Sequence, residues 1–256
     1  MHEAAQPYAA CVVPILGRGR RTQYAPKGSG VLFGTDQPQF LLSATHVLEE
    51  SRQGGILRMG VGSRIVMIAG RFAATAAHGP NALDVAICFF TDAAVTPSSG
   101  VRWVKPDELQ AASTPPSSSL HVVIGFPHTK QASYPINGVL DLNAMIHWGN
   151  GRDAAEISRF GRNPSTHLLV DFDKNDVIGP RGVTTSADPY GMSGGGVWSA
   201  PRPLEKGAQP WEFAGIAIEW RKGREKGILA TRVQHVLSLI AGKSATMAPA
   251  LSPFIR

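Results

Sequence analysis

A serine flanked by glycines stands near the carboxyl end of the chain, in residues 188–198 (DPYGMSGGGVW). Glycines permit positive φ and a close approach of the backbone to a substrate, so successive N–H groups can turn toward a developing oxyanion. Val197 and Trp198, which follow, are typical of an apolar strand. Ser193 is therefore a candidate nucleophile, although Gly-Ser runs also form turns that have no chemical role.

Two upstream segments contain the other groups that a serine nucleophile needs. Residues 40–47 (FLLSATHV) predict a strand that ends at His46, and residues 81–90 (NALDVAICFF) place Asp84 at the start of an apolar strand. A base activates the hydroxyl, and an anion orients the base. Taken singly, His46 also fits a structural histidine at a strand end, and Asp84 fits a solvated residue that caps a turn. The three lie far apart in the chain, so only tertiary folding can unite them.

These three segments, in this order, resemble those of trypsin-like serine peptidases, the chymotrypsin-fold group. In that family a Thr/Ser-Ala-Ala/Thr-His pattern contains the histidine, an Asp-Ile/Val-Ala strand contains the aspartate, and Gly-x-Ser-Gly-Gly contains the serine. Further similar segments lie at residues 28–33 (GSGVLF), 123–127 (VIGFP) and 213–218 (FAGIAI), so the resemblance runs from about residue 8 to about residue 240. It implies an all-β fold of two six-stranded antiparallel β-barrels and a C-terminal α-helix, with the active site between the barrels.

The apolar pattern agrees with this fold class. The chain has 256 residues with 28 glycines and 19 prolines, which suits many short strands joined by turns. Short apolar runs lie at residues 12–16, 31–33, 40–42, 65–68, 85–90, 122–124, 168–170 and 215–218. Only the segment from Thr231 to about Lys243 has helical spacing, with apolar residues at Val233, Val236, Leu237 and Ile240.

The same pattern divides the single peptidase domain. Residues 8–110 are predicted to form the first barrel and residues 121–230 the second. The low-complexity residues 111–120 would connect them, because a run of Ala, Ser, Thr and Pro buries little apolar surface. Residues 231–243 would form the helix and residues 244–256 a surface tail.

The resemblance implies a serine endopeptidase that acts through an acyl-enzyme. His46 would be the general base, Asp84 would fix its tautomer, and Ser193 would attack the peptide carbonyl. The backbone N–H groups of Gly191 and Ser193 would form the oxyanion hole.

The resemblance also places a specificity pocket, with Ala187 at its floor. Asp188 and Glu219 would favour a basic residue before the scissile bond, whereas Tyr190 and Trp220 would narrow the pocket toward small side chains. Both alternatives stay open. The pocket set is Ala187, Asp188, Tyr190, Ile218, Glu219 and Trp220.

One position departs from the digestive branch of the family. Those enzymes have an aspartate just before the serine, which pairs with an amino terminus released by zymogen cleavage, and here the residue is Met192. A thioether cannot form that ion pair, and the chain has no Ile-Val-Gly-Gly start. We therefore expect no activation by amino-terminal processing. The oxyanion loop would be held by packing or by a ligand, which allows for a regulatory partner.

Composition and missing motifs exclude several other functions. The net charge is +6 and the pI about 9.6, but the basic clusters at residues 18–21 and 221–226 have no interleaved aromatic residues. They favour solvated turns over a nucleic-acid surface. No metal-binding, phosphate-loop or dinucleotide motif occurs, so neither a metal nor a cofactor is expected.

Localisation follows from the apolar segments and the cysteines. No apolar run reaches the ~18 residues needed to cross a bilayer. Cys11 and Cys88 lie in apolar strands and are expected to be buried free thiols rather than a disulfide. The amino terminus has no secretory leader pattern. We therefore expect a cytoplasmic enzyme of bacterial type that acts on a protein or peptide substrate, with no membrane partner.

Two other functions fit the same residues. A catalytically silent binding or regulatory module could keep the fold, but such relatives usually lose one of the three catalytic residues, and none is missing here. An esterase could use the same acyl chemistry, but strand-like Val197 and Trp198 follow the serine, so it is not in the Gly-x-Ser-x-Gly elbow between a strand and a helix. The endopeptidase is the preferred interpretation.

Overall fold

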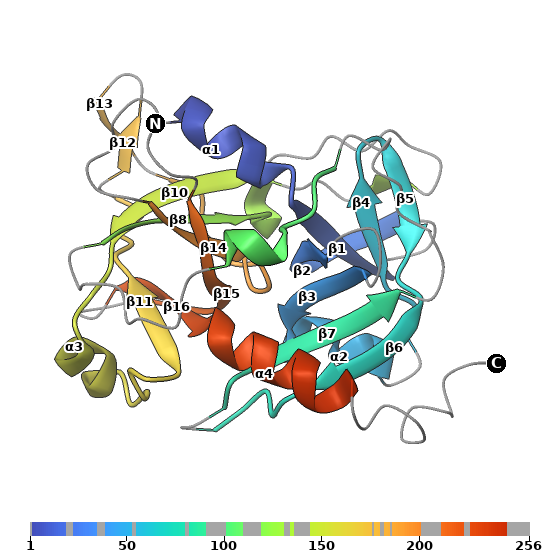
Figure 1. The fold of residues 1–256 in the computed structure, drawn as a ribbon. Helices are drawn as coiled ribbons and strands as arrows, with labels where there is room; N and C mark the ends of the chain where they lie inside the picture. The colour runs from blue at the N-terminus through green and yellow to red at the C-terminus, as the bar shows by residue number, and fades with distance from the viewer. Residues whose placement is uncertain are drawn as a thin grey trace.

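Two antiparallel β-sheets, one from each half of the chain, form the body of the computed structural model (Figure 1). The structure describes residues 2–18, 23–34, 39–52, 55–79, 82–90, 101–109, 119–130, 134–135, 144–175, 177–179, 182–184, 186–200, 211–222 and 226–244. Both sheets curl into half-barrels, as in the chymotrypsin fold, and the all-β prediction with a C-terminal helix is confirmed.

The first sheet has the strand order β5-β4-β1-β2-β3-β7-β6, and β9 pairs with β2 beside this path. Its strands are β1 (Val12–Arg18), β2 (Gln23–Gly34), β3 (Gln39–Ala44), β4 (Arg58–Val61), β5 (Arg64–Met67), β6 (Gly70–Ala74), β7 (Val85–Phe90) and β9 (Tyr134–Pro135). The sheet thus has eight strands rather than six. One of the additional strands, β9, comes from the second half of the chain and pairs through Tyr24 and Tyr134.

The second sheet has the six strands expected, in the order β10-β8-β14-β15-β16-β11. Its strands are β8 (Leu120–Gly125), β10 (Met145–Asn150), β11 (His167–Val170), β14 (Gly196–Ala200), β15 (Glu212–Arg221) and β16 (Gly227–Arg232). A separate hairpin pairs β12 (Val177–Gly179) with β13 (Gly182–Thr184). The strand β14 is fully buried, which is the environment that its apolar sequence predicts.

The described residues include four α-helices rather than the single helix predicted. They are α1 (His2–Ala9), α2 (Thr45–Arg52), α3 (Ala154–Arg159) and α4 (Val233–Ser244), with short 3-10 turns at Pro106–Glu108 and His128–Lys130. The first three have eight residues or fewer, which is too short for a clear helical period. A capping box of Asp153 and Glu156 marks the start of α3 and could have been recognised in the sequence.

The C-terminal helix begins later than predicted. Thr231 and Arg232 belong to β16, and α4 starts at Val233. Val233 and Val236 are fully buried where α4 packs against β15 and β16 of the second sheet and β6 of the first. This helix therefore spans both halves (Figure 1).

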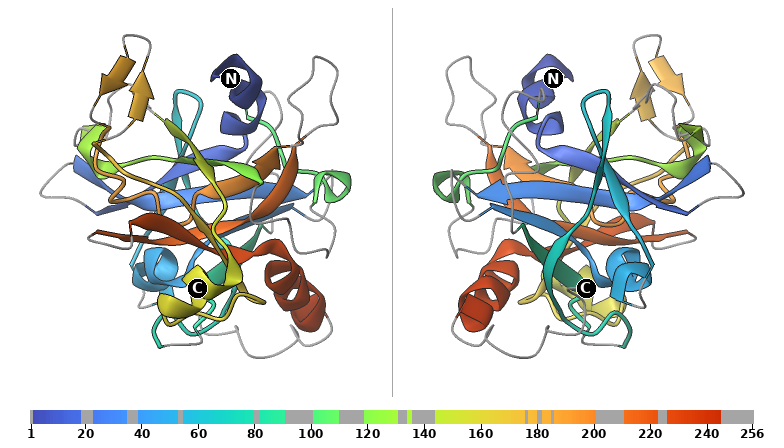
Figure 2. Two further views of the ribbon diagram at one scale, coloured as in Figure 1. Left: turned by 90° about the vertical axis from the view of Figure 1, so that its left-hand side faces the viewer. Right: turned by 90° about the vertical axis from the view of Figure 1, so that its right-hand side faces the viewer.

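The predicted domain boundaries fall only partly within the described residues. Most of the predicted linker 111–120 and nearly all of the tail 244–256 lie outside the described residues, and Leu120 already begins β8. Tyr8, placed in the first barrel by the sequence, instead packs on the second. Its ring stacks on Trp211 with centroids 4.9 Å apart, and its hydroxyl accepts a hydrogen bond from the backbone N–H of Trp211 at 2.8 Å. Figure 2 shows α1 and α4 at opposite ends of the molecule.

Both cysteines are buried free thiols, as predicted. Burial raises the pKa of Cys11 to about 11, although the neighbouring Arg102 lowers it in part, and burial raises the pKa of Cys88 to about 12. Because the thiolate is the reactive form, these side chains behave as small apolar groups in the folded protein.

Two core histidines, His147 and His167, link folding to pH. Burial lowers the pKa of both rings and outweighs hydrogen bonds to the carbonyls of Asp171 and Ala82, which raise it. The folded protein therefore keeps both rings neutral at pH values where the unfolded chain, with an ordinary histidine pKa of about 6.5, binds protons. Their contribution to stability is complete above that pH and is lost as the pH falls below it.

His147→Gln is expected to reduce the loss of unfolding free energy between about pH 7.5 and about pH 5, because each such histidine contributes a slope of up to ~1.4 kcal/mol per pH unit. Glutamine keeps a donor for the Asp171 carbonyl, which His147 Nε2 reaches at 2.7 Å, but does not titrate. Urea denaturation at a series of pH values measures the slope. A slope equal to that of the wild type would contradict this role.

Candidate active site

The structure brings His46, Asp84 and Ser193 to the wall of one cavity of about 490 Å³. His46 is the second residue of α2, directly after β3, and Asp84 directly precedes β7. The strands β3 and β7 are antiparallel neighbours that pair Ala44 with Val85, so the end of one lies beside the start of the other. Ser193 comes from the loop before β14 in the second half. The cavity therefore lies where the two halves meet.

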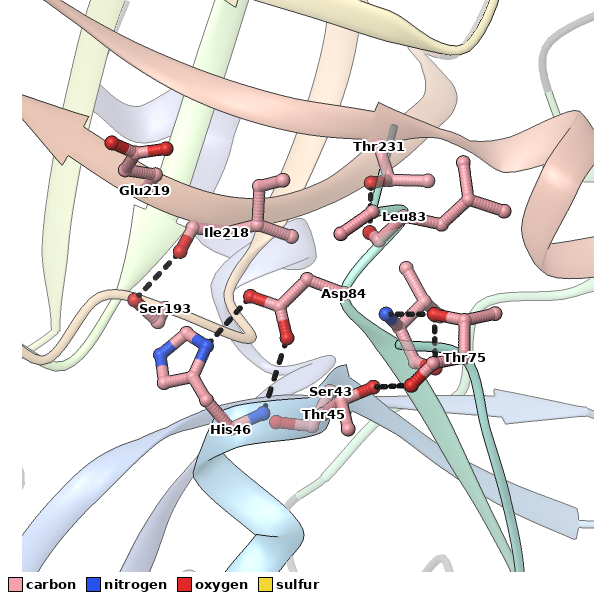
Figure 3. Close-up of polar contacts among 12 residues, drawn as sticks. Ser43, Thr45, His46, Thr75, Leu83, Asp84, Ser193, Ile218, Glu219 and Thr231 are labelled. Carbon is pink, nitrogen blue, oxygen red and sulfur yellow. Dashed lines mark hydrogen bonds and ion pairs between the residues drawn. The ribbon is translucent and has the colours of Figure 1, made fainter. Parts of the chain in front are cut away.

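Asp84 holds His46 with both carboxylate oxygens (Figure 3). His46 Nδ1 lies 2.6 Å from Asp84 Oδ2 and donates to it, while the backbone N–H of His46 donates to Oδ1 at 3.1 Å. The carboxylate side chain is 8% exposed and the imidazole 36%. With its proton on Nδ1, the ring has a free lone pair on Nε2, which is the form that a general base requires.

Asp84 also has an unusual backbone. Its φ of 50° is the only positive value at a non-glycine among the described residues. This left-handed conformation is unfavourable by roughly 1–2 kcal/mol for a residue with a side chain. Two hydrogen bonds stabilise this conformation. The Asp84 N–H donates to the Ala76 carbonyl at 3.0 Å, and the Asp84 carbonyl accepts from the Thr45 N–H at 3.1 Å.

Ser193 points its hydroxyl at the backbone rather than at the histidine. Its Oγ donates to the Ile218 carbonyl at 3.2 Å (Figure 3). Rotation about χ1 is the change that would redirect Oγ toward His46, since side chains exchange between staggered rotamers. Hydrogen bonds of this kind often tighten only when a substrate is bound.

Two anchored carbonyls set the direction of the predicted oxyanion-hole donors. The Tyr190 carbonyl accepts from the backbone N–H of His128 at 2.8 Å, and the Met192 carbonyl accepts from the Gly195 N–H at 2.8 Å. In a trans peptide the carbonyl of one residue and the N–H of the next point in opposite directions. The N–H groups of Gly191 and Ser193 therefore point away from His128 and Gly195, which bind the preceding carbonyls. Neither donates to another group of the described residues. Gly191 has φ +98°, a conformation that favours glycine.

Ser29 of the first sheet supports this loop. Its N–H donates to the Ser193 carbonyl at 2.8 Å, and its Oγ donates to the Gly191 carbonyl at 3.2 Å and accepts from the Phe126 N–H at 2.8 Å. Met192 is 2% exposed and packs in an apolar cluster of the second half. In this structure the loop is thus held by packing and by hydrogen bonds from the backbone and side chain of Ser29.

The predicted specificity residues separate into two groups. Tyr190, Ile218, Glu219 and Trp220 line the cavity. Ala187 instead packs with Trp220 against the same apolar cluster as Met192. Asp188 lies 3.5 Å from Lys222 Nζ, which also lies 4.5 Å from the centre of the Trp220 ring.

Glu219 is held by two arginines, a feature that the sequence did not reveal. Arg162 Nη2 donates to its Oε2 at 3.0 Å, and Arg221 Nε donates to its Oε1 at 2.7 Å. Burial raises the pKa of Glu219, but the hydrogen bonds and charges of Arg221 and Arg162 outweigh it and lower the pKa overall. Since both acidic candidates are paired with cations, the geometry does not favour the first of the two alternatives, a basic substrate residue.

Sequence reasoning missed several other lining residues. They are Lys27, Ala77, His78, Gly79, His128, Arg162 and Pro189. Lys27 and His128 directly adjoin recognised motifs and Pro189 lies within one, so these three could have been proposed from the sequence. Ala77, His78, Gly79 and Arg162 lie in loops that carry no pattern. Burial lowers the pKa of His128, and the charge of Lys27 adds to this, while a hydrogen bond to the Lys27 carbonyl opposes it.

The described residues contain no group of three or more His, Cys, Asp or Glu side chains arranged to hold a metal ion. None of the described helices is long and apolar enough to cross a bilayer.

Comparison with known proteins supports the fold. No family model and no curated protein matches the chain. A solved structure described as "Structure of GrC" is similar to it, with a TM-score of 0.60, 13% identity, and coverage of 93% of this chain and 96% of that chain. At this identity the likeness shows the fold, which is that of the chymotrypsin-type serine proteases.

Proposed function

We propose that the chain is a serine endopeptidase that hydrolyses peptide bonds through a His-Asp-Ser triad and an acyl-enzyme. The observation that carries the proposal is the His46–Asp84 pair, in which both carboxylate oxygens bind the histidine, on the wall of the same cavity as Ser193. The protease fold and the two N–H groups turned away from their anchored carbonyls support it.

The proposed reaction begins when Ser193 Oγ leaves the Ile218 carbonyl and turns to His46 Nε2. His46 takes the proton as Oγ attacks the peptide carbonyl, and Asp84 stabilises the imidazolium. The N–H groups of Gly191 and Ser193 donate to the oxyanion, each contributing about 3 kcal/mol of transition-state stabilisation. His46 then protonates the leaving amine, and water attacks the acyl-enzyme by the reverse steps.

The proposed substrate has a small residue before the scissile bond. Trp220 lines the cavity, and its indole packs edge-on against Phe172 with ring centroids 6.1 Å apart. Lys222 Nζ lies over the indole, 4.5 Å from its centre. Ala187 and Trp220 pack against the same apolar cluster, and Ala187 is not at the cavity wall. The indole thus occupies space that a large substrate side chain would need.

A fluorophosphonate probe tests the proposal, because it phosphonylates only an activated serine. We expect the probe to label Ser193, as located by peptide mapping, and expect the protein to cleave casein. Ser193→Ala should lose both activities, whereas Ser238→Ala, which alters an exposed serine of α4, should keep both. Labelling that persists in Ser193→Ala would place the nucleophile elsewhere.

The same assays separate the alternative functions. The hydrogen bond from Ser193 to Ile218, rather than to His46, is the feature that a catalytically silent binding module would share. That module would show neither labelling nor cleavage. An esterase would label Ser193 and hydrolyse an ester but leave casein and a peptide library intact.

A further inference from the structure

The segment that leads into Asp84 belongs to the first half of the chain but is bound by side chains of the second half. Three of these donate hydrogen bonds to its carbonyl groups: Arg162 Nη1 to Gly79 at 2.7 Å, His167 Nε2 to Ala82 at 3.2 Å, and Thr231 Oγ1 to Leu83. The last of these carbonyls directly precedes Asp84, as Figure 3 shows. The backbone of the carboxylate is therefore fixed across the boundary between the two sheets.

The donors are themselves held rigidly. His167 and Thr231 are fully buried and face each other as register partners on β11 and β16. The Ala82 carbonyl can only accept, so its contact with His167 requires the ring proton on Nε2. His167 Nδ1 lies 2.8 Å from the Thr166 hydroxyl, which is also 3.1 Å from the Asn163 carbonyl. The Arg162 side chain is 13% exposed and also binds Glu219.

The segment ends at Asp84, whose carboxylate position depends on an unusual backbone conformation. Asp84 adopts a φ of 50°, which few residues with side chains adopt without support from their surroundings. Its carboxylate must reach the Nδ1 and the backbone N–H of His46 at once. A rotation of the Leu83–Asp84 peptide would displace the carboxylate, and misplacement by about 1 Å can lower a catalytic rate ~100-fold.

We propose that Arg162, His167 and Thr231 form an inter-barrel clamp whose role is to position Asp84 and, through it, His46. The three are positioning residues, since they act on the carbonyl groups before Asp84. The histidine and aspartate come from the first half, and Ser193 and the clamp come from the second. The acid–base pair is therefore completed only when the half that supplies the nucleophile is docked. The catalytic consequence rests on the proposed peptidase function, but the positioning of His46 does not.

Thr231→Val and Thr231→Ser form the first test. Valine keeps the shape and burial of threonine but removes the donor, whereas serine keeps the hydroxyl. The His46 Nδ1–H, in a short hydrogen bond to a carboxylate, should give a strongly downfield proton resonance. We expect Thr231→Val to weaken or shift this resonance and to lower kcat about 10–100-fold with KM changed little. Thr231→Ser should retain both.

A second pair of variants tests the other end of the clamp and remains informative if Thr231→Val does not fold. Arg162→Gln removes the donor to Gly79 but also one partner of Glu219. Arg221→Gln is its matched control, because Arg221 binds Glu219 through Nε and does not touch the segment before Asp84. Arg162→Gln should alter the His46 resonance, and Arg221→Gln should leave it as in the wild type.

The outcomes separate this proposal from the proposed function. If the folded Thr231→Val and Arg162→Gln proteins keep the wild-type resonance and kcat and lose only melting temperature, the three residues stabilise the fold alone and the clamp proposal is wrong. If the wild type neither labels nor cleaves, but Thr231→Val still alters the resonance, the peptidase proposal fails and the clamp stands. The resonance can be read in any folded variant, including Ser193→Ala.

Discussion

Asp84→Asn is expected to lower kcat on a peptide substrate about 10⁴-fold while the protein stays folded. Asp84 accepts two hydrogen bonds from His46, one from Nδ1 and one from the backbone N–H. An asparagine has only one accepting oxygen. If that oxygen faces the backbone N–H, the amide NH₂ faces Nδ1, which must then act as an acceptor. The ring proton moves to Nε2, and the ring can no longer take a proton from Ser193.

Asp188→Asn is the matched control for this substitution. It makes the same chemical change in a carboxylate close to Ser193 in sequence, one that lies 3.5 Å from Lys222 Nζ rather than against His46. We expect kcat within about threefold of the wild type, since Lys222 is 69% exposed in this ion pair and asparagine keeps an oxygen that can accept from the Tyr190 N–H. Steady-state kinetics on one peptide measures both variants. Equal effects of the two substitutions would refute the role of Asp84.

Gly191→Ala is expected to lower kcat about 10²–10³-fold, the usual effect of losing one oxyanion donor. Gly191 has φ +98°, and an added Cβ would overlap the ring of His128. The backbone N–H of the same His128 anchors the Tyr190 carbonyl and so directs the Gly191 N–H. Displacement of His128 would break its hydrogen bond to the Tyr190 carbonyl and allow the Tyr190–Gly191 peptide to rotate.

Gly161→Ala separates the loss of a donor from general backbone strain. Gly161 also has a positive φ, +69°, but nothing lies within 4 Å of an added Cβ. The substitution should destabilise the fold by about 1 kcal/mol and leave kcat unchanged. Thermal unfolding and kinetics of both variants make the comparison. If Gly191→Ala kept full kcat, its N–H would have no role in the reaction.

The sequence predicted the fold because the fold depends on local patterns. Short apolar runs bounded by glycine and proline predicted most strands of the two sheets but missed β4, β6, β9, β10 and β16. Asp84 directly precedes a strand and Ser193 lies in a glycine-rich loop, as predicted, whereas His46, predicted at a strand end, is the second residue of α2. The short helices were missed since α2 and α3 have too few residues to show a period. The start of α4 was placed two residues early, because Thr231 fits the helical spacing as well as it fits β16.

The cavity walls depend on contacts that no local pattern contains. Arg162 lies 57 residues before Glu219 and in a different element, so its pairing with that carboxylate was not visible in the sequence. Considered alone, Glu219 indicated a basic substrate residue, and the arginines alter that interpretation. The donors that hold the segment before Asp84 were missed for the same reason, since each binds a backbone carbonyl, which every residue has.

The burial of Met192 bears on how such an enzyme would be regulated. A new terminal ammonium inserted beside this thioether would find no counter-ion there, and burying an unpaired charge is strongly unfavourable. We therefore predict that peptide-bond cleavage upstream does not switch the loop on through an ion pair with the residue before Ser193.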